Sequence, residues 1–274
     1  MRILIFGPGY TAGHLFDRLA DKARIATVTR DDFADAERVT FEIANATHIL
    51  SSVPPTDDGD PVLAAYGGAL AAAPAWLGYL SATGVYGDTG GAWVDETAPY
   101  GRGRRAARAH ADAAWSALAN ARIFRLPGIY GPGRSALDRV ARGETRRIDA
   151  PGQVFSRVHV DDIVAGVIAG FDGPPGAYNL ADDEPAANGD VVAYACALLG
   201  ITAPAPIPLA EANLSPQALG FYAENRRIAN GKARRVLGWR PLYPDYRLGL
   251  RALSAITSPA ITSAAPPAAS HDQT

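Results

Sequence analysis

The sequence is poor in the residues that build disulfides and metal sites. Cys196 is the single cysteine among 274 residues, so the chain forms no internal disulfide, and we expect a reducing, cytoplasmic location. The five histidines lie at no ligand spacing, which predicts no metal site. No serine stands in a G-x-S-x-G turn, which argues against that class of hydrolase.

Long apolar runs and a strong net charge are also missing. The apolar run at residues 1–6 meets a glycine at once, and is too short for a signal peptide or for a membrane span of about 20 residues. The formal net charge is −2, which gives no electrostatic argument for binding nucleic acid or an anionic membrane. We therefore expect a small-molecule substrate, with no nucleic-acid and no membrane partner.

Short apolar runs alternate with alanine-rich stretches along the first half of the chain. The runs at residues 2–6, 24–29, 48–53, 76–81 and 122–126 are typical of buried strands. Helix-compatible stretches lie between them, at residues 11–20, 61–72 and 104–120. Strands that alternate with helices imply right-handed crossovers, so the sequence predicts an α/β fold with a doubly wound parallel sheet.

The character of the chain changes after Pro127, where clusters of glycine and proline separate shorter elements. These clusters predict that residues 1–256 form a single domain with a small substrate lobe. The lobe is expected to consist mainly of residues 129–155 and 181–245. Residues 156–171 resemble a short strand and a helix that returns to the main sheet. Residues 257–274 lack periodicity, and we expect a disordered tail there.

A glycine-rich segment, G-P-G-Y-T-A-G, follows the first strand and matches G-x-G-x-x-G/A. In this motif one glycine permits the tight turn, a second lets the backbone approach a pyrophosphate, a small residue allows close packing, and the helix N-terminus faces the anion. A plain tight turn is the alternative interpretation. The motif predicts a Rossmann-type dinucleotide site formed by Gly7, Gly9, Tyr10, Thr11 and Ala12.

The end of the second strand bears on which dinucleotide is bound. An acidic residue there binds the ribose 2′-hydroxyl of NAD, whereas an arginine accommodates the 2′-phosphate of NADP. The strand ends with Thr29 and Arg30, which favours NADP. In the alternative, Arg30 is a solvated charge and Asp31 binds the ribose of NAD.

Five segments in order resemble the short-chain dehydrogenase/reductase superfamily, in its extended and atypical branches of epimerase/dehydratase-like proteins. They are G-P-G-Y-T-A-G at Gly7, Y-L-S-A-T-G-V-Y-G-D at Tyr79, R-L-P-G-I-Y-G-P-G-R at Arg125, S-R-V-H-V-D-D-I-V at Ser156 and Y-N-L-A-D-D-E-P at Tyr178. The resemblance implies an NAD(P)-binding Rossmann fold with a small carboxyl-terminal substrate lobe. It also implies a homodimer.

The resemblance implies roles for further residues. Ser51, Ser52 and Val53 would line the cofactor, Pro127 to Ile129 would lie near the nicotinamide, and Arg134 would face the substrate. Each has a structural alternative, as a strand-end or surface residue. The resemblance gives His159, Asp161 and Asp162 a structural role, in which they tie the returning helix to the sheet.

The superfamily's catalytic pair, a tyrosine with a lysine four residues later, is missing. The two lysines, Lys22 and Lys232, do not follow a tyrosine at that spacing, and Tyr100 has Arg104 in the lysine's place. Ala82 stands where an orienting serine or threonine is usual. The remaining candidates for catalysis are Thr83, Tyr86 and Tyr100.

Two functional interpretations remain open. The first is an NAD(P)-dependent oxidoreductase or epimerase/dehydratase-like protein that acts on a small polar, sugar-like substrate. The second is an NADP(H)-binding sensor or binding module without the tyrosine and lysine chemistry. A basic patch at Arg102, Arg104, Arg105 and Arg108 is interpreted as a solvated helix face, with anion binding as the alternative.

Overall fold

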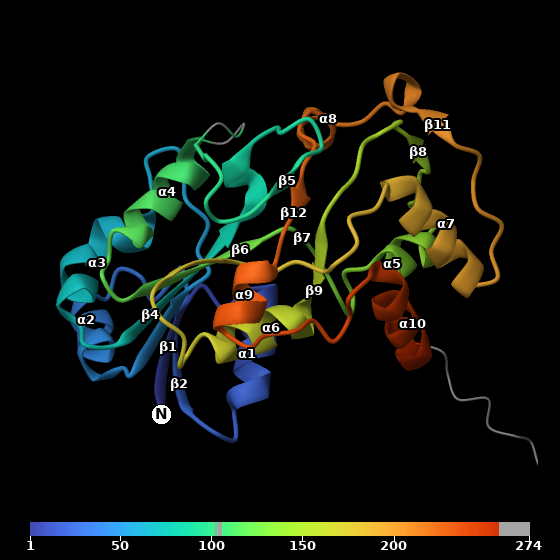
Figure 1. Cartoon of the computed structure of the whole chain (residues 1–274). Coiled ribbons are helices and arrows are strands. Elements are labelled where there is room, and N and C mark those ends of the chain that lie inside the picture. The colour runs from blue at the N-terminus through green and yellow to red at the C-terminus, as the bar shows by residue number, and fades with distance from the viewer. Residues whose placement is uncertain (102, 104–105, 258–274) are drawn as a thin grey trace, which may run out of the picture.

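The computed structural model describes residues 1–101, 103 and 106–257, and its centre is a six-stranded parallel sheet (Figure 1). The strand order is β10-β6-β4-β3-β1-β2. This is the predicted doubly wound arrangement, because the chain moves outward from β1 in both directions. The strands are β1 (Arg2–Phe6), β2 (Arg24–Val28), β3 (His48–Ser51), β4 (Trp76–Ala82), β6 (Ala121–Leu126) and β10 (Gly176–Asn179).

Helices cover both faces of the sheet, as parallel strands require. One face carries α1 (Tyr10–Leu19), α6 (Val160–Ala169) and α9 (Gly231–Val236), and the other carries α2 (Ala36–Asn45), α3 (Pro61–Ala72) and α4 (Ala106–Ser116) (Figure 1). Strand β6 is buried along its whole length, as expected for a strand packed on both faces.

The predicted strands and the helix at residues 61–72 form where the sequence places them. The second and third strands end earlier than predicted, at Val28 and Ser51. The last residues predicted for these two strands instead leave the sheet at its carboxyl edge, where the candidate site lies. Helix α2 was not predicted from the sequence; the carboxylate of Asp35 caps it by accepting the Arg38 N–H.

The smaller lobe covers the carboxyl edge of the sheet and has its own apolar core. Helices α5, α7 and α10 pack together in this core through Leu137, Val192, Cys196 and Leu250. The lobe and its junction contain β5 (Trp93–Val94), β7 (Gly128–Tyr130), α5 (Ala136–Ala141), β8 (Ile148–Asp149), β9 (Arg157–His159), α7 (Asn188–Leu198), β11 (Ile207–Pro208), η2 (Leu209–Glu211), α8 (Pro216–Tyr222), β12 (Arg227–Ile228) and α10 (Tyr246–Thr257).

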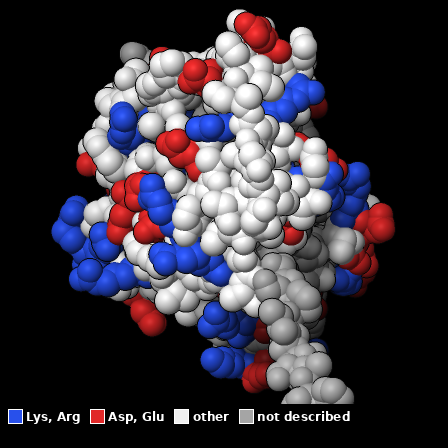
Figure 2. Space-filling view, turned by 90° about the vertical axis from the view of Figure 1, so that its right-hand side faces the viewer, with Lys and Arg blue, Asp and Glu red and all other residues white. Residues whose placement is uncertain are grey.

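Charged side chains of both signs surround a broad uncharged middle on the face of the lobe seen in Figure 2. None of the helices in the described part of the chain is long and apolar enough to cross a membrane. The tail expected at residues 257–274 lies outside the described residues, except for Thr257 at the end of α10.

The segment that returns to the sheet has the expected structural role. The His159 side chain caps α6 by accepting the Asp161 N–H at 3.2 Å. The Asp162 carboxylate accepts the N–H groups of Leu242 (2.5 Å) and Tyr243 (3.1 Å), and so fixes the chain that leads into α10. Among the described residues no cluster of His, Cys, Asp or Glu side chains could hold a metal ion.

Candidate functional site

The glycine-rich segment forms a tight turn between β1 and α1. Gly7 has a φ of +72°, and a Cβ there would lie 2.9 Å from Val53 Cγ2, so any larger residue is disfavoured. Gly9 opens into the cleft described below, and the nearest atom to a Cβ on Gly9 is 4.0 Å away. Ala12 is fully buried between helix and sheet. The turn therefore has the geometry that the motif predicts.

The N-terminus of α1 has no side chain that satisfies its free N–H groups. Gly9 is the N-cap and supplies no side-chain hydrogen bond, and the first turn contains no acidic residue. The partial positive charge of the helix is therefore left for an anion. A pyrophosphate fits this position, because the backbone of Gly9 is open to the cleft.

A cleft of about 770 Å³ lies between the carboxyl edge of the sheet and the lobe. It begins at the glycine turn and runs past the ends of β3, β4 and β6, where ligands bind in open α/β sheets. Its main-domain side contains several residues expected from the sequence to bind the cofactor, namely Gly9, Tyr10, Thr11, Ser52, Pro127 and Ile129.

Other residues expected at the cofactor lie behind this surface. Gly7 and Ala12 shape the turn, and Val53 packs against Gly7. Ser52 donates its hydroxyl hydrogen bond to the Gly7 carbonyl. Ser51 is fully buried and does not line the cleft, and within the described residues its hydroxyl has no hydrogen-bond partner.

The residues after β2 form a network that leaves the arginine exposed. The N–H and hydroxyl of Thr29 both donate to Asp32, at 2.9 and 2.6 Å, and Arg38 pairs with the same carboxylate at 2.5 Å. These bonds, led by the Thr29 hydroxyl, lower the pKa of Asp32 to about 2. The Asp32 carboxylate is thus already hydrogen-bonded, whereas Arg30 and Asp31 are exposed after the end of β2, and neither they nor Thr29 line the cleft.

Thr83 is the catalytic candidate that the structure brings into the cleft. It follows β4, at the start of the short 3₁₀ helix η1 (Thr83–Tyr86). Within the described residues its hydroxyl has no recorded hydrogen bond, so it is available to a ligand. Ser81 also lines the cleft, but its hydroxyl donates to Asp112 at 2.6 Å.

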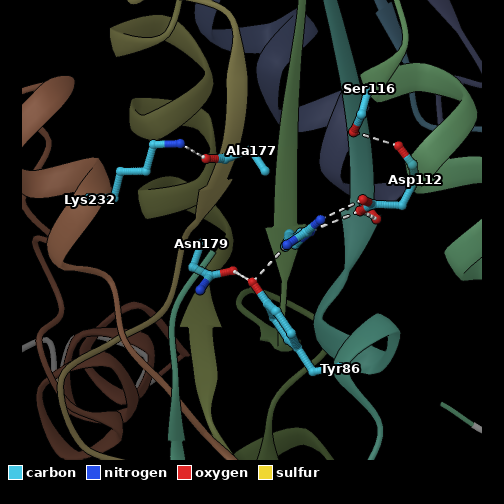
Figure 3. Close-up of polar contacts among 8 residues, drawn as sticks. Tyr86, Asp112, Ser116, Ala177, Asn179 and Lys232 are labelled. Atoms are coloured by element: carbon cyan, nitrogen blue, oxygen red, sulfur yellow. Dashed lines mark hydrogen bonds and ion pairs between the residues drawn. The ribbon is translucent and has the colours of Figure 1, made fainter. Parts of the chain in front are cut away.

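A buried network of polar side chains supports the strand end from behind (Figure 3). The Arg125 guanidinium donates two hydrogen bonds to the Asp112 carboxylate, at 2.7 and 3.0 Å, and one to the Tyr86 hydroxyl at 3.0 Å. The Tyr86 hydroxyl donates in turn to Asn179 at 2.8 Å. These residues connect the 3₁₀ turn after β4 with α4, β6 and β10.

Tyr86 and Tyr100 do not line the cleft, which corrects the expectation that either could donate a proton there. Tyr86 is 2% exposed and its hydroxyl is already paired. Burial raises the pKa of the Tyr86 phenol, although Arg125 opposes this, so the direction is the reverse of what proton donation near neutral pH needs. Tyr100 is 41% exposed, and its ring lies against Arg125 at 4.7 Å.

Neither lysine replaces the missing catalytic lysine. Lys232 projects from α9 and donates to the Ala177 carbonyl on β10 at 2.8 Å (Figure 3). Lys22 is exposed after the end of α1, away from the glycine turn. Arg104, which stands in the lysine's place in the sequence, lies outside the described residues, as do Arg102 and Arg105.

Arginines reach the cleft from both sides. Arg134 lines it as expected, with its guanidinium 5.4 Å from the Tyr10 ring centre, close to the glycine turn. Arg108 on α4 also lines it, so this member of the basic patch is not only a solvated residue. Arg139, Arg157 and Arg226 also line the cleft, and the sequence did not predict this because they come from distant segments.

Solved structures with the same fold include one close in sequence. A functionally unknown conserved protein from Silicibacter pomeroyi DSS is 42% identical, with a TM-score of 0.85, over 93% of this chain and 98% of that one. The human epimerase family protein SDR39U1, solved with NADPH, has the same fold at 17% identity, with a TM-score of 0.72, over 93% of this chain and 99% of that one.

Among curated proteins, a 3-diazoavenalumate denitrifying reductase from Streptomyces sp is 33% identical over 140 residues. The match covers 47% of this chain and 45% of that protein, so the chain spans about half the length of this curated relative. No protein-family model matches the sequence.

Proposed function

We propose that the chain, whose motifs resemble the short-chain dehydrogenase/reductase superfamily in its epimerase/dehydratase-like branch, is an NADP(H)-dependent oxidoreductase or epimerase for a small polar substrate. One observation carries the proposal: the glycine turn, Thr83 and the segment from Pro127 to Ile129 open into one cleft. When bound, the nicotinamide would supply or accept a hydride.

The residues of the chain have separate tasks in this proposal. The N–H groups at the start of α1 bind the pyrophosphate, and Arg30, which follows the second strand as the NADP pattern requires, pairs with the 2′-phosphate. Thr83 orients a substrate oxygen through its hydroxyl. The lobe covers the reacting atoms and excludes water. The reductase activity in the name of the curated relative, and NADPH in the human structure, support this assignment.

The second candidate function is an NADP(H)-binding sensor. It is favoured by the placement of Tyr86 and Tyr100 outside the cleft, which leaves no tyrosine of the catalytic segment at the substrate. Thr83 favours the enzyme, because a free hydroxyl at the strand end has no evident structural task.

The proposal is tested by titrating the protein with NADPH and NADH separately, and following nucleotide fluorescence. We expect tighter binding of NADPH, and Arg30→Ala should weaken it at least tenfold while NADH binding changes little. Loss of a charge-assisted hydrogen bond to phosphate accounts for this size.

Arg24→Ala is the matched control, because Arg24 is equally exposed but lies at the opposite end of β2. It should leave both affinities unchanged. If neither nucleotide binds the wild-type protein, the proposal is wrong. Equal affinities for NADPH and NADH would show that the protein binds both nucleotides and that Arg30 does not discriminate between them.

A further inference from the structure

Two distant segments lie side by side and form part of the lobe side of the cleft. The Gln153 side chain donates to the Glu224 carbonyl at 2.9 Å, and the Ile228 N–H donates to the Ser156 hydroxyl at 3.0 Å. These bonds hold residues 153–157 against residues 224–228, opposite the glycine turn and Thr83. Of these segments, residues 154–157, Glu224, Arg226 and Ile228 line the cleft.

The lobe side of the cleft combines arginines with an apolar surface. Its lining includes two phenylalanine rings and several branched aliphatic side chains, but few amides or carboxylates that could pair with sugar hydroxyls. The one acidic residue lining the cleft within the described part of the chain, Glu224, is paired with Arg226. The apolar lining consists of Val154, Phe155, Val191, Phe221, Ile228 and Leu250.

Arg226 projects from this apolar side toward the end of β4. Its Nη1 donates to the Gly87 carbonyl at 2.8 Å and to the Glu224 carboxylate at 2.9 Å, which fixes the guanidinium. Its Nη2 lies 4.0 Å from where a Cβ on Gly84 would be, next to Thr83. Within the described residues Nη2 makes no hydrogen bond, so this nitrogen of the guanidinium can donate to an oxyanion.

The cleft has an excess of positive charge that the cofactor does not fully account for. Arg134 lies by the glycine turn, on the side of the pyrophosphate, whereas Arg226 lies on the side of Thr83. The charged residues that line the cleft are Arg108, Arg134, Arg139, Arg157, Arg226 and Glu224. This imbalance favours anions throughout the cleft.

We propose that the substrate is a small organic oxyanion with an apolar body, bound through its oxyanion by Arg226. The apolar body lies against the side formed by Phe155, Phe221 and Ile228, and the oxyanion sits beside Thr83. This inference rests on the proposed function, since it names the substrate of the same cleft. It replaces the sugar-like substrate expected from the sequence.

The test measures binding of four probes to the NADPH-loaded protein by calorimetry: trans-cinnamate, phenyl phosphate, the neutral cinnamamide and UDP-glucose. We expect cinnamate or phenyl phosphate to bind at least tenfold more tightly than cinnamamide and UDP-glucose. The stronger of the two anions identifies the oxyanion as carboxylate or phosphate. Arg226→Gln should weaken the binding of this anion at least tenfold, and should change the affinity for cinnamamide less than twofold.

Two further variants keep the test decisive. Arg226→Gln breaks the ion pair with the buried Glu224 carboxylate, so the double variant with Glu224→Gln removes both charges of this pair together. Arg142→Gln is the matched control, because Arg142 is an exposed lobe arginine that pairs with Glu144 and does not line the cleft. It should leave all four affinities unchanged.

The inference is overturned if NADPH binds but cinnamamide or UDP-glucose binds as tightly as both anions. It is also overturned if the folded double variant keeps the full affinity for the anion. Because NADPH binding is measured first, its absence would identify a failure of the proposed function instead.

Discussion

The two sides of the cleft are built in different ways. The main-domain side consists of strand ends and a glycine turn, whose positions follow from the backbone hydrogen bonds of the sheet. The lobe side includes two short segments, joined by side chains from residues more than 70 positions apart. In the proposed function, the cofactor is recognised by backbone geometry, whereas the substrate is recognised by side chains that can vary without altering the sheet.

The largest expected effect concerns the buried network behind the main-domain side. In the native pair the Asp112 side chain is 0% exposed and the Arg125 side chain is 3% exposed. Asp112→Ala therefore leaves Arg125 buried without its counter-ion. We expect a loss of about 3 to 5 kcal/mol in the free energy of unfolding, measured by urea denaturation. Glu144→Ala breaks an exposed pair and should cost less than about 1 kcal/mol. Equal losses in the two variants would show that the network does not support this side.

The link between the main domain and the lobe should depend on pH. Burial raises the pKa of Asp162 from 3.8 to about 6, although the two backbone N–H groups that donate hydrogen bonds to its carboxylate act to lower the pKa. Because the folded pKa is the higher one, the folded state binds the extra proton. The contribution of Asp162 to the free energy of unfolding is therefore largest below about pH 4, and it declines as the pH rises to about 6.

Asp162→Asn tests this dependence, since the amide resembles the protonated acid at every pH. The stability of the variant relative to wild type should increase between pH 4 and 6 by up to about 3 kcal/mol, at about 1.4 kcal/mol per pKa unit. Urea denaturation at both pH values measures the difference. A constant difference across this range would contradict the raised pKa.

Tyr86 should behave as a core residue and not as a catalytic one. Tyr86→Phe removes the hydroxyl that joins Arg125 to Asn179, and leaves both partners less well satisfied. We expect a loss of about 2 kcal/mol in the free energy of unfolding, with the affinity for NADPH unchanged. A stable variant that loses turnover on an identified substrate would restore the catalytic role.

The smallest expected effect sharpens the role of the α1 N-terminus. Thr11→Asp places a carboxylate in the first turn, which stabilises the free helix by about 0.3 to 1 kcal/mol but repels a pyrophosphate. NADPH should bind at least tenfold more weakly, and the melting temperature of the free protein should rise slightly. Thr11→Asn has nearly the same shape without the charge, and should bind NADPH within about threefold of wild type. Equal affinities of the two variants would argue against a phosphate at this position.

The sequence by itself determined the sheet and the glycine turn. Residues 2–6 are a continuous apolar run closed by Gly7, and the pattern repeats at each strand of the main domain, so local signals suffice. Such signals place Thr83 and Pro127 at strand ends, because parallel strands present their carboxyl ends at one edge. The structural positions of His159 and Asp162 were implied by the family resemblance and not by a local pattern.

Only the tertiary structure decided which side chains reach the cleft. The hydroxyl of Tyr86 and that of Thr83 are three residues apart, yet the turn of η1 buries the first against Arg125 and leaves the second open. Arg226 lies more than 140 residues from Thr83 in the sequence, and comes to Gly84 only because β12 pairs with β5. Long-range packing, which no local pattern encodes, therefore selects the residues that meet the substrate.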